Sequence, residues 1–162
     1  MKISFIGGGK MAEAMISGIL ANGISKPTDI YVADPLESRR KQLSNSHGIS
    51  VTTDNLDAVG HGTLIVLAIK PQTLSEVLKE LKDSIGTEQT ILSIVAGAPI
   101  ATLASGLNHE KIVRVMPNMP AQIGAGISLW VATPTIEDSF RKAVSTIIDT
   151  LGQQLEVSDE KY

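Results

Sequence analysis

Short aliphatic runs alternate along the chain with segments in which apolar residues recur at helical spacing. Runs of this kind, bounded by Gly, Pro or polar residues, are typical of strands buried on both faces. The predicted strands are Ile3–Ile6, Ile30–Ala33, Ile49–Val51, Thr63–Ile69, Thr90–Val95, Lys111–Met116, Ile127–Val131 and Leu155–Val157.

Helical periodicity fills most of the intervals between these runs. The helix behind Gly7–Gly9 ends at Asn22-Gly23, and a polar helix follows Pro35. Pro71 opens the next helix, because proline suits the first helical position. A short helix is expected over Ile100–Leu107. Thr135 and Asp138 resemble a capping box for a last helix. Its predicted apolar face comprises Phe140, Val144, Ile147, Ile148 and Leu151.

The alternation of strand and helix predicts β-α-β units and therefore a parallel sheet with right-handed crossovers. The expected fold is an α/β, Rossmann-type, doubly wound sheet that is mostly parallel. Extra strands after Lys111 extend one edge, which we expect to turn antiparallel. Charged residues make up only 19% of the chain, below the ~25% of an average domain, which fits large, fully buried elements. We expect residues 1–162 to form one domain.

Composition excludes several function classes. A net charge of -3 argues against a nucleic-acid partner, which needs a basic surface. The lack of cysteine excludes disulfides, thiolate zinc sites and cysteine nucleophiles. No metal site is predicted, because His47, His61 and His109 are isolated. No apolar run has membrane-spanning length and no signal peptide is recognisable, so we expect a cytoplasmic protein without a membrane partner.

The turn after the first strand carries the most specific chemistry. Gly7, Gly9 and Ala12 fit the pattern G-x-G-x-x-G/A between a strand and a helix. Gly7 permits a sharp turn, Gly9 lets a pyrophosphate approach the backbone, and Ala12 lets the helix pack closely on the strand. The helix amides then face the phosphates. The alternative is a tight strand-to-helix turn that binds nothing.

Asp34 ends the second predicted strand, where a dinucleotide domain places the acid that binds the adenosine ribose. A carboxylate there favours NAD over NADP, because it repels a 2′-phosphate. Arg39 and Arg40 follow closely and offset that preference. The alternative role for Asp34 is to form the turn before Pro35.

Three segments in this order resemble pyrroline-5-carboxylate reductase: Phe5–Ala14, Leu67–Gln72 and Arg114–Pro120. The resemblance covers essentially the whole chain. The family usually has Thr at Met119 and Ala at Gly8, and we expect the exchange at Gly8 to be harmless in a backbone cradle. The resemblance also implies a second, helical domain that carries the dimer interface and most of the imino-acid pocket. Because the chain ends near that boundary, we expect it to be the cofactor domain alone, with homo-oligomers only when the helical domain is present.

The resemblance implies NADP or NAD, in reduced form, as the cofactor, and it assigns the cofactor contacts by position. The residues assigned in this way would surround the pyrophosphate, contact the adenosine half of the cofactor and border the nicotinamide half mainly through their backbone groups. They are Ile6, Gly7, Gly8, Gly9, Lys10, Met11, Asp34, Asn55, Ala68, Ile69, Lys70, Pro71, Ile94, Val95 and Ala96.

Two polar residues have competing interpretations. The ammonium of Lys70 would bind phosphate or protonate the imine, but we favour a backbone position that Pro71 holds extended. Asn118 is a weak catalytic candidate that would orient nicotinamide or substrate. Equally, its side chain would support the turn between Pro117 and Pro120.

The implied reaction is hydride transfer from the nicotinamide to the C=N carbon of 1-pyrroline-5-carboxylate, giving proline. No triad or metal is required, because an iminium is already electrophilic. Two other functions stay open. One is a methyltransferase that uses S-adenosylmethionine, which the glycine spacing fits poorly. The other is a non-catalytic module that senses NAD(P)H or regulates a partner.

Overall fold

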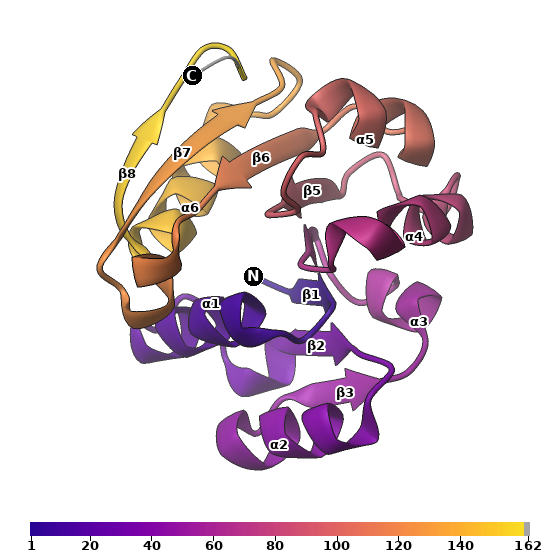
Figure 1. Cartoon of the computed structure of the whole chain (residues 1–162), viewed down its shortest axis with the longest axis vertical. Coiled ribbons are helices and arrows are strands. Elements are labelled where there is room, and N and C mark those ends of the chain that lie inside the picture. Colours follow the sequence, from indigo (N-terminus) through magenta and orange to yellow (C-terminus); the bar gives the residue numbers. More distant parts are fainter. Residues whose placement is uncertain (161–162) are drawn as a thin grey trace.

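The computed structural model describes residues 1–160, and of Met119 it describes only the backbone. Strands and helices alternate through most of this length (Figure 1). The strands are β1 (Ile3–Ile6), β2 (Ile30–Ala33), β3 (Ser50–Thr52), β4 (Leu64–Leu67), β5 (Thr90–Ser93), β6 (Ile112–Met116), β7 (Gly126–Ala132) and β8 (Gly152–Glu156). The helices are α1 (Lys10–Ala21), α2 (Glu37–His47), α3 (Asn55–Val59), α4 (Leu74–Leu81), α5 (Ile100–Leu107) and α6 (Asp138–Asp149). Short 3-10 turns are η1 (Pro27–Asp29), η2 (Pro71–Thr73) and η3 (Met119–Ile123).

The described strands form one sheet in the order β3-β2-β1-β4-β5-β6-β7-β8. The first six run parallel, which confirms the doubly wound order, and β7 pairs antiparallel with β6. The predicted antiparallel edge is therefore confirmed. β8 then returns parallel to β7 after α6. Strand order reverses between β1 and β4, where Ile3 is in register with Leu64. Ligands of such sheets bind at that point, beyond the carboxyl ends of the strands.

Helices cover both faces of the sheet, so two apolar layers enclose it (Figure 1). One layer joins α1, α2 and α6 to the strands through residues such as Met15, Leu43 and Ile147. The other joins α3, α4 and α5 through residues such as Leu78 and Leu103. Burial on both faces explains the near-continuous aliphatic runs of the central strands.

Several predicted boundaries shift. The run Thr63–Ile69 is strand only over Leu64–Leu67, and Thr90–Val95 ends at Ser93. The residues that follow each strand leave the ladder and become loop at the sheet edge. The last strand starts at Gly152 rather than Leu155, because pairing with β7 and not hydrophobicity defines it.

The capping box at Thr135 and Asp138 is wrong. Helix α6 begins at Asp138, its N-cap is Glu137, and no side chain caps it. The Thr135 hydroxyl instead donates to the carbonyl of Glu110. Helix α3, which is only five residues long, has too short a pattern to predict. None of the described helices is long and apolar enough to cross a membrane.

Candidate functional site

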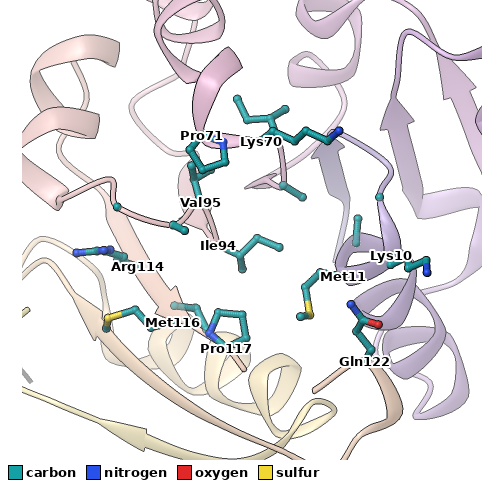
Figure 2. Close-up of a pocket in the computed structure, with 17 residues that line it drawn as sticks. Lys10, Met11, Lys70, Pro71, Ile94, Val95, Arg114, Met116, Pro117 and Gln122 are labelled. Atoms are coloured by element: carbon teal, nitrogen blue, oxygen red, sulfur yellow. The ribbon is translucent and has the colours of Figure 1, made fainter. Parts of the chain in front are cut away.

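A cavity of about 560 Å³ opens at the carboxyl edge of the sheet, where strand order reverses. Its walls come from the start of α1, the loops after β4 and β5, the end of β6 and η3. Figure 2 shows Met11 and Ile94 pointing into the space between these walls. The lining residues are Gly9, Lys10, Met11, Ala12, Ala68, Ile69, Lys70, Pro71, Ile94, Val95, Ala96, Gly97, Arg114, Val115, Met116, Pro117 and Gln122.

The glycine turn has the local geometry that its motif predicts. Gly7 has a φ of +98°, and a Cβ there would lie 2.6 Å from the carbonyl oxygen of Ala68. Only glycine tolerates that conformation and that approach. Ala12 is buried against the sheet. At Gly9 a Cβ would meet nothing within 4 Å, so the space beside it is open.

The start of α1 is free to bind an anion. Its N-cap is Gly9, and no side chain caps the helix. The amides of the first turn have no partner within a helix, and they carry the positive end of the helix dipole. Lys10 is exposed and belongs to the same turn, so it adds a positive charge at this end of the cavity.

Asp34 and Arg39 contact the glycine turn from the side of β2 and α2. Oδ2 of Asp34 accepts the amide of Gly8 at 2.9 Å, and Oδ1 accepts the amide of Leu36 at 2.9 Å. Nε of Arg39 donates to the carbonyl of Gly8, and its Nη2 donates to the carbonyl of Gly9 at 3.0 Å. Both the turn-forming role of Asp34 and its place beside the glycine turn are thus observed.

Glu13 and His47 complete this cluster. Glu13 binds Nη2 of Arg39 at 2.8 Å, and Nε2 of His47 donates to its other oxygen at 3.1 Å. Burial acts to raise the pKa of the Glu13 carboxyl. The hydrogen bonds from His47 and Arg39 and the charge of Arg39 outweigh burial, so the pKa lies below its ordinary value. Arg40 turns elsewhere and donates to the carbonyl of Asp34.

The predicted nicotinamide wall is assembled in one place. Ala68–Pro71 and Ile94–Ala96 lie on adjacent loops because β4 pairs with β5. Lys70 has an extended backbone, and its carbonyl accepts the Thr73 hydroxyl at 2.9 Å. Lys70 is exposed and also lines the cavity, so the choice between its backbone role and a role for its ammonium stays a prediction.

Other predicted residues lie outside the cavity lining. The side chain of Ile6 is buried in the core, so only its backbone is near the site; its carbonyl accepts the amide of Ala68 at 2.8 Å. Asn55 begins α3 and donates to Glu80 at 3.1 Å. Oδ1 of Asn118 accepts the amide of Ile127 in β7 at 3.1 Å, and its side chain makes no capping hydrogen bond to η3, so both interpretations of Asn118 stay predictions.

A Cβ at Gly8 would lie 2.7 Å from Cδ1 of Leu43 and 3.1 Å from Cγ1 of Val32. Both side chains are fully buried, so alanine would require Leu43 to move. Packing against α2 therefore favours glycine at this position in this chain, which the local motif does not reveal. The expectation that glycine in place of the family's alanine is harmless for cofactor binding stays a prediction.

Sequence reasoning missed the wall formed by β6 and η3, including Arg114, Met116 and Gln122. Arg114 is largely buried and pairs with Glu160 at 3.0 Å, and its Nε has no partner within residues 1–160. The sequence did contain evidence for part of this wall, since Arg114–Pro117 belongs to a motif already identified by resemblance. Within the described residues, no three His, Asp or Glu side chains gather as metal ligands do.

Comparison with known proteins agrees with this geometry. Residues 2–97 match the family described as NADP oxidoreductase, coenzyme F420-dependent. A pyrroline-5-carboxylate reductase of Methanosarcina acetivorans is 37% identical over 159 residues, covering 98% of this chain and 59% of the relative. The resemblance predicted from three motifs is confirmed at the level of sequence.

Solved structures extend the similarity to three dimensions. A pyrroline-5-carboxylate reductase from Coxiella burnetii has a TM-score of 0.93 at 30% identity, covering 98% of this chain and 59% of that one. The Plasmodium falciparum enzyme, solved with NADP bound, has a TM-score of 0.83 at 26% identity, with coverages of 98% and 58%. The chain thus spans about three-fifths of the length of these relatives.

Proposed function

The chain belongs to the family of NADP oxidoreductases described as coenzyme F420-dependent, and on this premise we propose that it is the dinucleotide-binding part of a pyrroline-5-carboxylate reductase. The observation that carries the proposal is the glycine turn. It opens, with its helix uncapped, onto a cavity whose opposite wall is Ala68–Pro71 and Ile94–Ala96. Relatives that match 98% of the chain carry this activity in their names.

The residues fit a dinucleotide. The open space at Gly9 and the free first-turn amides of α1 suit a pyrophosphate held by Gly8–Met11. The apolar side chains of Ile94, Val95 and Met116 suit the flat face of a nicotinamide ring. When bound, the reduced cofactor supplies the hydride that reduces the C=N carbon of 1-pyrroline-5-carboxylate.

The chain's own residues contribute binding and orientation. Backbone groups of Ala68–Pro71 border the nicotinamide half, and Pro71 keeps Lys70 extended at that border. Apolar walls exclude water from the ring. Neither Lys70 nor Asn118 is needed as an acid, because an iminium already carries the proton that its reduction requires.

Cofactor choice depends on Asp34 in this proposal. Its carboxylate lies beside the glycine turn, where the adenosine ribose of a bound dinucleotide would lie. A negative charge there disfavours the 2′-phosphate of NADPH, and Arg40, bound to the carbonyl of Asp34, partly offsets it. Asn55, on α3, would contact the adenosine side.

We further propose that the imino acid is held mainly by residues beyond this chain, since the relatives are longer. Residues 1–162 would then form one NAD(P)-binding domain, and the homo-oligomer would depend on the additional residues. Positioning the two reactants is worth roughly 7–11 kcal/mol in such reactions. We therefore expect this chain to bind cofactor but to turn over substrate poorly.

Fluorescence titration of the chain with NADPH and NADH tests binding, and loss of cofactor absorbance with racemic pyrroline-5-carboxylate tests turnover. A version extended to the relatives' length is assayed beside it. Binding by both forms, with turnover only by the longer one, supports the proposal. Binding without turnover by either form favours the non-catalytic, NAD(P)H-sensing alternative. Binding of S-adenosylmethionine instead would favour a methyltransferase.

A further inference from the structure

One side chain, that of Arg39, binds two carbonyl groups of the glycine turn, and the amide of Glu13 also donates to the second of them at 3.0 Å. Nε of Arg39 donates to the Gly8 oxygen, and Nη2 donates to the Gly9 oxygen at 3.0 Å. In a trans peptide the C=O and the following N–H point in opposite directions. Arg39 therefore directs the amide of Gly9, and together with the Glu13 amide that of Lys10, away from α2 and toward the cavity that these two residues line.

Arg39 is itself fixed in place. Its Nη2 binds Glu13 at 2.8 Å, and its Nη1 donates to Oε1 of Gln42 at 2.7 Å. His47 binds the second oxygen of Glu13 at 3.1 Å. The side chains of Arg39 and His47 are only 17% and 16% exposed. With its donors directed at four acceptors, the planar guanidinium has one available orientation.

Asp34 holds the same turn in a complementary way, because its carboxylate accepts the amide of Gly8. Asp34 thus binds one amide of the turn and Arg39 binds two of its carbonyls, and both approach from the side of β2 and α2. The amides that point to the cavity are preorganised before any ligand arrives.

We propose that Arg39 is a positioning residue for the pyrophosphate of the bound dinucleotide. It acts through the backbone of Gly8 and Gly9, without contacting the cofactor, and it strengthens NADH and NADPH binding alike. This inference rests on the proposed function, because it presumes a dinucleotide in the cavity. It differs from the sequence-based expectation that Arg39 offsets the repulsion of a 2′-phosphate.

The test compares Arg39→Met with Arg39→Lys and with Lys41→Met. Lys41 lies on the same helix, is 71% exposed and pairs only with Glu37 among the contacts of the described residues, so its substitution removes the same charge elsewhere. Dissociation constants are measured for NADPH, NADH and adenosine 2′-monophosphate, which carries the 2′-phosphate but no pyrophosphate. Thermal melting confirms that each variant is folded.

We expect Arg39→Met to weaken the binding of NADPH and of NADH by a similar factor, about tenfold, and to leave the affinity for adenosine 2′-monophosphate unchanged. Arg39→Lys should restore little, since an ammonium cannot span both carbonyls. Lys41→Met should bind as the parent does. If Arg39→Met fails to fold, Glu13→Gln frees the guanidinium and should produce a smaller loss of the same kind.

Three results would overturn the inference: unchanged affinities in Arg39→Met, a loss confined to NADPH and adenosine 2′-monophosphate, or full affinity in Arg39→Lys. The second would assign Arg39 to the 2′-phosphate, and the third would reduce its role to charge. A parent chain that binds neither dinucleotide would instead contradict the proposed function.

Discussion

Oδ2 of Asp34 accepts the backbone amide of Gly8 at 2.9 Å, so the acid that ends β2 holds the turn that ends β1. β1 and β2 are paired in register from Ile3 and Ile30 onward, and this pairing brings the two ends together. One carboxylate therefore serves two purposes in the proposed function. It shapes the phosphate turn, and its charge selects between NADH and NADPH.

Replacing Asp34 by Asn separates these purposes. The amide oxygen of Asn can still accept the Gly8 amide, while the charge and the acceptor for the Leu36 amide are lost. We expect the affinity for NADPH relative to NADH to rise by about 1 kcal/mol, roughly fivefold, because a unit charge near a partly solvated phosphate is removed. Titration of both cofactors measures the ratio. An unchanged ratio would show that Asp34 does not face the ribose.

Substitution of Gly9 by Val should remove dinucleotide binding from a folded chain. A Cβ at Gly9 meets no protein atom within 4 Å, so the fold has room for a side chain, but the proposed pyrophosphate would lie there. We expect affinity to fall by more than about tenfold with little change in melting temperature. Gly60→Ala is the control, since its Cβ makes only ordinary contact at 3.4 Å. Parental affinity in folded Gly9→Val would refute the phosphate assignment.

Gly8→Ala tests packing behind the turn. Its Cβ would crowd Cδ1 of Leu43 at 2.7 Å, and overpacking of a buried site typically costs about 1–3 kcal/mol. Combining it with Leu43→Val removes the crowding atom. We therefore expect the double variant to be more stable than the sum of the two single effects, as measured by urea unfolding. Simple additivity would mean that Leu43 and Gly8 do not compete for space.

Glu13 should make stability depend on pH. Its pKa in the folded chain lies below the ordinary 4.5, so its stabilising contribution is complete well above 4.5. That contribution disappears as pH falls through the lowered folded value. We expect Glu13→Gln to cost about 1–2 kcal/mol at pH 7, and this cost to shrink as the pH falls below 4.5 toward the lowered folded pKa. Urea unfolding across this range measures it.

The control for that series is Glu37→Gln, which removes an exposed carboxylate paired with Lys41 on the same helix as Arg39. Such pairs contribute little, so its effect should be near zero at every pH. A pH-independent cost of Glu13→Gln would show that the carboxylate acts by shape alone.

The local pattern of apolar and polar residues predicts much of the fold. Ile3–Ile6, Ile30–Ala33 and Ile100–Leu107 have the predicted bounds, because each is a run whose period or polarity changes abruptly at its ends. Elements whose ends lack such a change in period or polarity have bounds or caps that the pattern predicts incorrectly. β8 is a polar edge strand, and α6 begins without the capping box that Thr135 suggested.

The candidate site likewise has parts that the sequence predicts and parts that only the tertiary structure determines. The glycine turn is readable from sequence because backbone conformation and close approach are local demands, as the φ of +98° at Gly7 shows. Two other features could not be read in this way: the contacts of Arg39 with Gly8 and Gly9, and the place of Gln122 in the cavity wall. They join residues far apart in the chain, and only strand order, register and helix packing determine which of them meet.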